Sequence, residues 1–318
     1  MAGGGPGGPG EDRADGGNAG GGPGGGPVGG GAFRAGLVQM TSGPAFDANL
    51  AAADRLIRQA AADGAHVVAT PENTPILQPD HAKLRALVPT EAAHPAVTAF
   101  AELARELGIW LLLGSTAVRV DDGDAPGADG RLANRSILFD DRGRIAARYD
   151  KIHMFDVDVP DGQTYRESGA FRPGANAVVA DTPWARLGLT VCYDVRFPAL
   201  YRALAHAGAG VLTVPAAFTQ VTGRAHWHTL LRARAIETGS YVLAPAQVGE
   251  HAQGRRTYGH TLAVAPWGEV IADLGDDGPG VVTVEIDPAA VAQARGWVPS
   301  LQHDRGFEVV AANAPARV

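Results

Sequence analysis

The chain has 318 residues, of which 45% are hydrophobic, and its formal net charge at pH 7 is −7. This acidic balance, together with the lack of any block of lysines and arginines, argues against a nucleic-acid-binding protein. No run of 18 apolar residues occurs, so we expect no transmembrane helix. The single cysteine, Cys192, excludes an intrachain disulfide framework and is consistent with a reducing, cytoplasmic location.

The first 31 residues differ from the rest of the chain in composition. Residues 1–31 are dominated by glycine and contain almost nothing to bury, so we expect this segment to be disordered. It lacks the apolar stretch of a secretory signal, and its glycines do not form a phosphate-binding loop. Residues 32–318 are of ordinary globular composition and are predicted to form one domain.

From Phe33 onward, short β-like runs alternate with amphipathic stretches typical of helices. The predicted β-like runs, in chain order, are residues 33–40, 65–73, 109–118, a hairpin at 133–151, 185–194, 211–218, 241–249, 259–274 and 280–287. The predicted helices are residues 49–64, 96–108, 197–210 and 225–240, and residues 121–130 are predicted to form an exposed loop. This alternation predicts a single α/β domain in which helices cover mixed sheets.

Three of the predicted strands end in a residue that can take part in catalysis. Glu72 follows Pro71 at the end of one strand, Lys151 ends the hairpin, and Cys192 lies near the end of the strand at 185–194. Functional residues of α/β folds collect at strand ends, so these side chains are expected in one crevice. A thiol is mostly protonated near neutral pH. A carboxylate can remove its proton during attack, and an ammonium can stabilise the resulting oxyanion.

Each of these residues also has an ordinary structural interpretation. A lone cysteine is often a small buried hydrophobe, and a glutamate or lysine at a strand end is usually a solvated surface charge. The combination of the three is more informative than any one of them.

Four motifs resemble those of the nitrilase or carbon–nitrogen hydrolase superfamily: TPEN, YDKIHMFDVDVP, TYRES and VCYDVRFP. That superfamily uses a Glu–Lys–Cys triad in this chain order. The resemblance implies that Glu72 is the general base and acid, Lys151 the oxyanion stabiliser and Cys192 the nucleophile. It also implies that Glu167 is an orienting second glutamate. The implied fold is a four-layer αββα sandwich with two mixed sheets between helices, usually assembled as a homodimer or larger homo-oligomer.

Three further stretches, HWHTLLRARAIET, YGHTLAVAPWG and VPSLQHDR, resemble the amidase branch that acts on deaminated glutathione. The resemblance implies a small-molecule amide substrate that is cut through a thioester, with cysteinylglycine as the leaving group. The neighbouring omega-amidases act on 2-oxoglutaramate-type substrates and release ammonia; they share the lysine motif, so this activity also fits the sequence. The same motifs are compatible with an N-carbamoyl or aliphatic amidase, and with a catalytically silent scaffold of the same fold.

Substrate-binding residues are predicted around the cysteine. The backbone N–H of Tyr193 is expected to join Lys151 at the oxyanion, and Phe218 either walls the pocket or belongs to the core. Arg196 is the preferred partner for a substrate carboxylate, with an ion pair to Asp194 or another acidic residue as its structural alternative. Three further arginines are weaker candidates and are interpreted mainly as surface charges: Arg172, Arg255 and Arg256.

The ten histidines raise the possibility of metal or histidine chemistry. His226 and His228 are two positions apart near a helix start, so they point to different sides, and no HExxH or Cys/His cluster occurs. We therefore expect no catalytic metal and no cofactor. His153 permits a rival cysteine–histidine scheme, although a buried hydrogen-bonded histidine is the favoured interpretation. The NRS sequon at Asn134 is given no functional weight.

Overall fold

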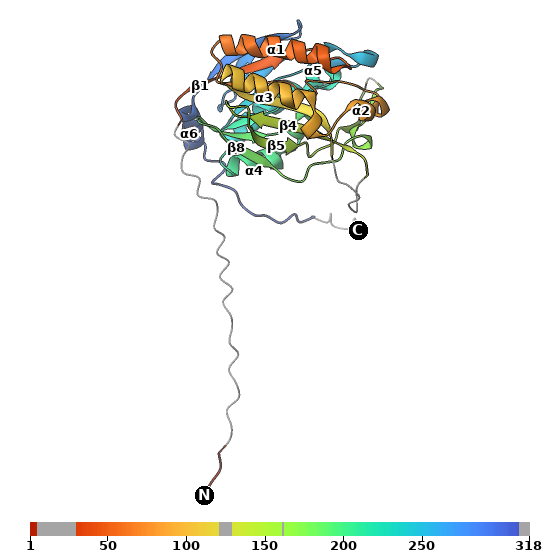
Figure 1. Ribbon diagram of the computed structural model, residues 1–318. Coiled ribbons are helices and arrows are strands. Elements are labelled where there is room, and N and C mark those ends of the chain that lie inside the picture. Colours follow the sequence, from red (N-terminus) through yellow and green to blue (C-terminus); the bar gives the residue numbers. More distant parts are fainter. Residues whose placement is uncertain (5–29, 121–128, 161, 312–318) are drawn as a thin grey trace, which may run out of the picture.

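The computed structural model describes residues 1–4, 30–120, 129–160 and 162–311. The predicted disordered segment at 1–31 and the predicted loop at 121–130 therefore lie mostly outside the described residues. Within them, two six-stranded sheets pack face to face, with helices on both outer surfaces (Figure 1). This arrangement confirms the predicted αββα sandwich.

The first sheet is mixed, and the predicted strand at the start of the domain is second from one of its edges. Strands β1, β2 and β3 are parallel, whereas β16, β4 and β5 join antiparallel to their neighbours. In spatial order, its strands are β16 (Gly280–Ile286), β1 (Phe33–Gln39), β2 (Val67–Ala69), β3 (Trp110–Arg119), β4 (Leu132–Phe139) and β5 (Ile145–Asp150).

The second sheet has the same mixed character, with β9, β10 and β11 parallel at its centre. In spatial order, its strands are β15 (Val270–Asp273), β14 (Leu262–Val264), β11 (Tyr241–Ala244), β10 (Val211–Thr213), β9 (Arg186–Leu189) and β8 (Val178–Asp181). Two small antiparallel pairs lie outside the sheets: β6 (Asp156–Asp158) with β7 (Thr164–Arg166), and β12 (Val248–Glu250) with β13 (Arg256–Tyr258).

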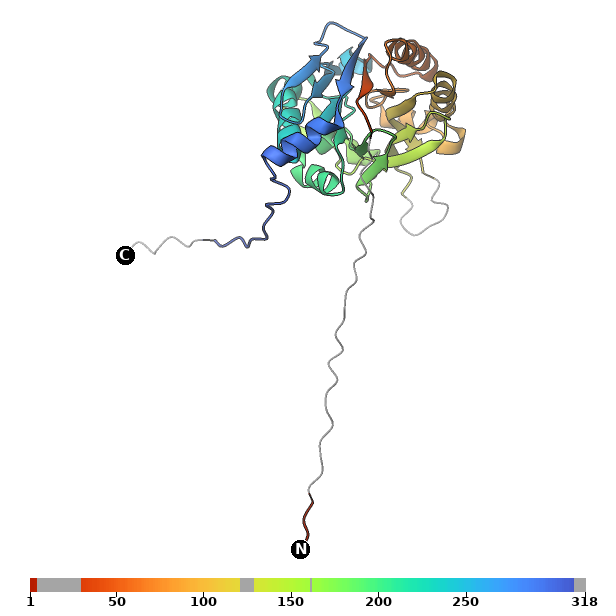
Figure 2. The same cartoon turned by 90° about the vertical axis from the view of Figure 1, so that its left-hand side faces the viewer.

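The helices bury one face each against a sheet. Helices α1 (Phe46–Ala62) and α3 (Pro95–Leu107) cover the first sheet, and α4 (Pro198–His206) and α5 (Gln220–Thr238) cover the second. Figure 2 shows α1 and α3 on the side of the molecule opposite α5. The described residues also form the helices α2 (His81–Leu87) and α6 (Pro288–Trp297). Short 3-10 helices are η1 (Glu91–Ala93), η2 (Glu167–Gly169), η3 (Cys192–Arg196) and η4 (Ala252–Gly254).

The hydrophobic core lies in separate layers. The largest cluster fills the space between the two sheets and continues under α4 and α5, with Leu37, Leu112, Leu189 and Leu212 fully buried. A second cluster lies between the first sheet and helices α1 and α3. Both faces of each sheet bury apolar surface, which explains why the sequences of the central strands are nearly continuous runs of apolar residues. No helix among the described residues is long and apolar enough to cross a membrane.

The predicted elements match the main helices and strands, with three kinds of difference. The strand predicted at 185–194 is wrong beyond Leu189, because Cys192–Arg196 form a 3-10 helix. The β-like runs at 241–249 and 259–274 are each divided between two strands. Helices and strands that the sequence patterns did not predict are α2, α6, β6, β7, β8 and β13, all short or peripheral.

Candidate active site

Glu72 is held at the carboxyl end of β2 by contacts from several elements. One carboxylate oxygen, Oε2, accepts a hydrogen bond from the backbone N–H of Ala217 at 2.8 Å. The other, Oε1, accepts from the side chain of Asn134 at 3.0 Å. Its backbone carbonyl accepts from the amide of Gln247 at 3.0 Å. Glu72 is therefore a buried, fixed carboxylate, 3% exposed, rather than a solvated strand end.

The close approach of β3 to this segment depends on Gly114. A methyl group at this glycine would lie 1.8 Å from the carbonyl oxygen of Thr70 and 2.7 Å from Cβ of Pro215. The carbonyl of Pro215 in turn accepts the backbone N–H of Cys192 at 2.9 Å. Gly114 thus lies between the segments that carry Glu72 and Cys192, beside a register shift in β3.

Lys151 directly follows β5 and is 2% exposed. Its Nζ atom donates to Oε1 of Glu72 at 2.9 Å and to Oε1 and Oε2 of Glu167 at 2.9 and 2.8 Å. Glu167, at the start of η2, also accepts the backbone N–H of Phe155 at 2.7 Å. The structure therefore places one ammonium between two carboxylates that lie far apart in the sequence.

Cys192 opens η3 in the left-handed region, with φ of 49°. This conformation is strained for a residue that carries a Cβ, and such strain is concentrated at functional sites. Asp194 fixes the turn: its carboxylate accepts the backbone N–H groups of Val191 at 2.8 Å and His153 at 3.1 Å. It also accepts the hydroxyl of Tyr149 at 2.7 Å. A fully buried carboxylate thus holds the cysteine turn in place.

The charges of these side chains determine where the protons lie. Burial raises the pKa of Glu72, but the charge of Lys151 and hydrogen bonds from Cys192 and Lys151 lower it below its ordinary value. Burial lowers the pKa of Lys151, yet the charges of Glu167 and Glu72 raise it well above its ordinary value. Burial and the charge of Glu72 raise the pKa of the Cys192 thiol well above its usual range. The resting site therefore holds a carboxylate, an ammonium and a neutral thiol.

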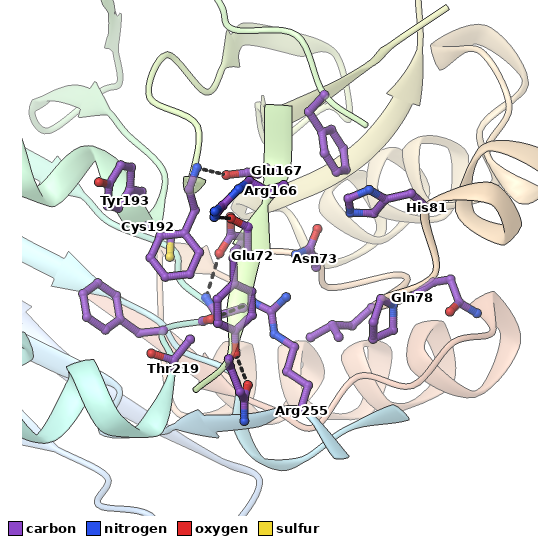
Figure 3. A pocket seen from close by; sticks show the side chains of 18 of the residues that line it. Glu72, Asn73, Gln78, His81, Arg166, Glu167, Cys192, Tyr193, Thr219 and Arg255 are labelled. Atoms are coloured by element: carbon purple, nitrogen blue, oxygen red, sulfur yellow. Dashed lines mark hydrogen bonds between the residues drawn. The ribbon is translucent and has the colours of Figure 1, made fainter. Parts of the chain in front are cut away.

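These residues line one cavity of about 650 Å³, which is large enough for a drug-sized ligand. Figure 3 shows Cys192, Glu72 and Glu167 around its centre, with Asn73, Gln78 and His81 toward one side and Thr219 toward another. The wall also includes apolar side chains from the loop after β2 and from α2: Ile76, Leu77 and Leu84. The predicted triad and Glu167 are thus brought together at one concave site.

The predicted substrate-binding residues lie in two layers around the cavity. Tyr193 and Phe218 line the cavity. Arg196 packs behind them, with its guanidinium carbon 5.8 Å from the Tyr193 ring centre and 5.2 Å from that of Phe218. Its Nη1 atom contacts Nδ1 of His226 at 3.2 Å. The alternative ion pair with Asp194 is not formed, since Asp194 bonds Tyr149 and His153 instead.

Two residues in the cavity region were undervalued from the sequence. Asn134, which was given no functional weight as part of a sequon, is 2% exposed and its Nδ2 atom donates to both Glu72 and Glu167. Arg255, interpreted as a surface charge, lines the cavity. Arg256 is exposed and pairs with Glu250 at 2.9 Å, as that interpretation predicted. The sequence holds no signal for these placements, because each depends on how distant loops meet.

The histidines considered in the sequence analysis contact side chains other than the predicted catalytic residues. Nδ1 of His153 lies 2.7 Å from Asp194, and its ring stacks on Phe197. His226 and His228 face different partners, as predicted: His226 contacts Arg196, and His228 contacts Asp273 at 3.0 Å. His228, His260 and Asp273 form a group of three possible metal ligands within 4.8 Å of one another, and none of them lines the cavity.

Comparisons with known proteins agree with this geometry. Residues 34–296 match the family model described as carbon-nitrogen hydrolase. A protein from Yersinia enterocolitica named deaminated glutathione amidase is 44% identical over 270 residues, which cover 85% of this chain and 92% of that protein.

Two solved structures show the same fold. A Saccharomyces cerevisiae member of branch 10 of the nitrilase superfamily superposes with a TM-score of 0.75 at 28% identity, over 86% of this chain and 96% of that one. A Nesterenkonia amidase, with the acetamide moiety of fluoroacetamide added covalently at its active-site cysteine, gives a TM-score of 0.70 at 28% identity, over 87% and 95%. With its αββα sandwich and a family match over most of its length, this chain belongs to the carbon–nitrogen hydrolase family of the nitrilase superfamily and is a hydrolase of amidase type.

Proposed function

We propose that this enzyme hydrolyses deaminated glutathione, cutting the amide between its 2-oxoglutarate unit and cysteinylglycine. The observation that carries the proposal is the Lys151 ammonium, held within 2.9 Å of both Glu72 and Glu167 beside Cys192 in one cavity. The naming of the Yersinia enterocolitica relative supports this substrate. The size of the cavity, about 650 Å³, suits a substrate with groups on both sides of the scissile amide.

In the first half of the proposed reaction, Sγ of Cys192 attacks the amide carbon while its proton passes to Glu72. The ionised Glu72 and the neutral thiol provide the protonation states that this step needs. Lys151 and the backbone N–H of Tyr193 stabilise the negative oxygen that develops. Glu72 then gives its proton to the departing nitrogen, the C–N bond breaks, and a thioester to Cys192 remains.

In the second half, water attacks the thioester carbon and gives a proton to Glu72. The C–S bond breaks, Glu72 returns the proton to the Cys192 sulfur, and 2-oxoglutarate leaves. A single carboxylate serves both halves because each half restores its charge. Glu167 is the proposed positioning residue, since its two oxygens hold Lys151 in place. Arg196 and Phe218 are proposed to contribute to substrate binding, Phe218 from the cavity wall and Arg196 from behind it.

The direct test is release of 2-oxoglutarate from deaminated glutathione, with 2-oxoglutaramate measured in parallel. Rapid release from the first substrate that disappears in Cys192→Ser is the expected result. A strong preference for 2-oxoglutaramate would instead assign the chain to the omega-amidases. Inactivity of the wild-type protein on both substrates would contradict the proposed function and direct attention to N-carbamoyl and aliphatic amides.

The rival cysteine–histidine scheme gives the opposite pattern in two variants. In the proposed mechanism Lys151→Met removes the oxyanion stabiliser and lowers kcat by about 10²–10³-fold. His153→Gln should lower kcat far less, because His153 is not among the described residues that line the cavity and its ring stacks on Phe197. Severe loss in His153→Gln with mild loss in Lys151→Met would favour the rival scheme.

We also propose that the protein forms a homo-oligomer in the cytoplasm. Several large apolar side chains are exposed near one another: the Trp267 and Trp297 rings lie 5.2 Å apart, and Ile236 packs against Gly268. Light scattering coupled to size-exclusion chromatography should give a mass of at least twice 32.7 kDa, and Trp267→Glu should lower it.

A further inference from the structure

Arg255 is a cation in the cavity wall, and within the described part of the chain it has no carboxylate partner. Across those residues, no Asp or Glu oxygen lies within ion-pair distance of it. Its Nη2 atom donates to the carbonyl of Ala217 at 3.1 Å, and its guanidinium carbon lies 5.6 Å from the Tyr165 ring centre. Figure 3 shows the side chain extending toward the middle of the cavity. The Arg255 charge thus lines the cavity without a described carboxylate to neutralise it.

One donor of Arg255 is both buried and unpaired. Its Nε atom has no hydrogen-bond partner among the residues that the structure describes. A buried charged donor without an acceptor is costly, so such a group calls for a partner from outside the chain, either an ordered water or a ligand. A guanidinium that lines a cavity without a carboxylate partner among the described residues is suited to a substrate carboxylate, which it can bind through two parallel hydrogen bonds.

The loop that carries Arg255 holds it in place before any ligand binds. The carbonyl of Arg255 accepts the backbone N–H of His251 at 2.7 Å. The His251 ring is buried between the carbonyl of Ser42, at 2.9 Å, and the hydroxyl of Thr257, at 2.7 Å. Both sides of Arg255 are thus anchored to the body of the protein, which limits the ordering cost of binding.

The other cationic side chains of the described cavity wall already have carboxylate partners. Lys151 is bonded to Glu72 and Glu167, and Arg166 pairs with Asp158 at 2.8 Å. Burial lowers the pKa of His81, which favours its neutral form. Arg255 is therefore the cation of the described cavity wall that remains open to an anionic substrate group.

The position of Arg255 indicates which half of the substrate it faces. Ala217 joins it to the general acid: the N–H of Ala217 donates to Glu72, and its carbonyl accepts from Arg255. Glu72 must lie beside the departing nitrogen to protonate it. Arg255 is therefore on the side of the amine product, whereas Arg196 lies behind Tyr193 and Phe218.

We propose that Arg255 binds a carboxylate on the amine half of the substrate, which in a cysteinylglycine leaving group is the terminal carboxylate of glycine. This proposal rests on the proposed function and narrows the range of substrates that the enzyme would accept. It would favour amides whose leaving group is an anionic peptide over primary amides that release ammonia.

Two substrates that release the same acid, 2-oxoglutarate, test the subsite: deaminated glutathione and its glycinamide analogue, in which the terminal carboxylate is an uncharged amide. In the wild-type enzyme, the acid should have a kcat/KM about 10–100-fold higher than the amide, mainly through KM. In Arg255→Gln, kcat/KM for the acid should fall to about that for the amide, while kcat/KM for the amide should change little. Arg255→Lys should recover part of the preference for the acid. Arg256→Gln, which alters an exposed neighbouring arginine, is the matched control and should match the wild type.

The outcomes separate this subsite from the proposed function. Wild-type inactivity on the acid would contradict the function itself. Equal wild-type kcat/KM on acid and amide would overturn the subsite without any variant. Equal losses in Arg255→Gln on both substrates would also overturn it, and would show that Arg255 acts through its charge on Glu72. In that case the acid limb of the pH profile would also move to higher pH, since loss of the Arg255 charge raises the pKa of Glu72.

Discussion

The Nζ atom of Lys151 lies 2.9 Å from Oε1 of Glu72, and both side chains are almost completely buried. Removing Lys151 would leave Glu72 as an uncompensated buried charge, which is strongly destabilising. Glu167 shares the same ammonium at 2.8 Å. The site is therefore a coupled group of charges, and its members respond to substitution together.

Glu167→Gln should lower kcat by about 10–100-fold, because Lys151 loses one of the two carboxylates that hold it. The raised pKa of Lys151 should fall toward its ordinary value, so the basic limb of the kcat profile should move to lower pH. Steady-state kinetics across the pH range measures both effects. Glu106→Gln, which removes an exposed partner of Arg58, is the control. A lower kcat with an unmoved basic limb would contradict the electrostatic explanation.

The acid limb of kcat/KM should report the lowered pKa of Glu72. Glu72 acts as a base only when ionised, so activity should persist as the pH falls past 4.5 and disappear at the lower pKa. Asn134→Leu removes a hydrogen bond to Oε1 and should move this limb up by about 1 pH unit. An acid limb that stays in place in Asn134→Leu would show that Asn134 does not tune Glu72.

The same lowered pKa has a consequence for stability. Since the folded-state pKa of Glu72 is below the unfolded one, its contribution to stability is present above the ordinary value of 4.5 and is lost as the pH falls through the folded pKa. Lys151 has the opposite sign: its contribution is complete below the ordinary value of 10.5 and is lost as the pH rises through its raised pKa. Urea unfolding of the wild type should show a plateau between these two values.

Asp194→Asn should reduce the free energy of unfolding by about 2–4 kcal/mol and lower kcat. The Asp194 carboxylate accepts hydrogen bonds from Val191, Tyr149 and His153 and donates none. The side-chain amide of asparagine would turn its NH₂ group toward at least one of these donors, so that hydrogen bond would be lost. Urea unfolding monitored by fluorescence measures the first effect. Asp54→Asn, on the exposed face of α1, is the control. A loss below about 0.5 kcal/mol would mean that the cysteine turn does not depend on this carboxylate.

Gly114→Ala should impair both stability and catalysis, because its methyl group would lie 1.8 Å from the Thr70 carbonyl. The backbone must shift to relieve the overlap, and that shift would displace the segments that carry Glu72 and Cys192. Gly296→Ala in α6 meets nothing within 4 Å and should be neutral or slightly stabilising. Thermal unfolding and kcat of the two variants provide the comparison, and equal behaviour would disprove the role assigned to Gly114.

Deletion of residues 1–29 should leave kcat/KM unchanged, since the cavity-lining residues that the structure describes all lie between Glu72 and Arg255. This follows the proposal that the glycine-rich segment and the hydrolase domain are separate. Activity of the shortened protein on deaminated glutathione is the measurement. A clear loss would assign the segment a role in the enzyme.

The sequence by itself determined the alternation of helices and strands and the identity of the four central candidates: Glu72, Lys151, Glu167 and Cys192. Periodic apolar patterns encode local structure, and motif spacing at strand ends is a local property of the chain. Only the tertiary structure decided that Cys192 begins a strained 3-10 turn, because Asp194 imposes that turn through contacts with β5 and the loop after it. Likewise, Asn134 and Arg255 reach the cavity because segments distant in the chain pack together, and no local pattern records which polar side chains then meet.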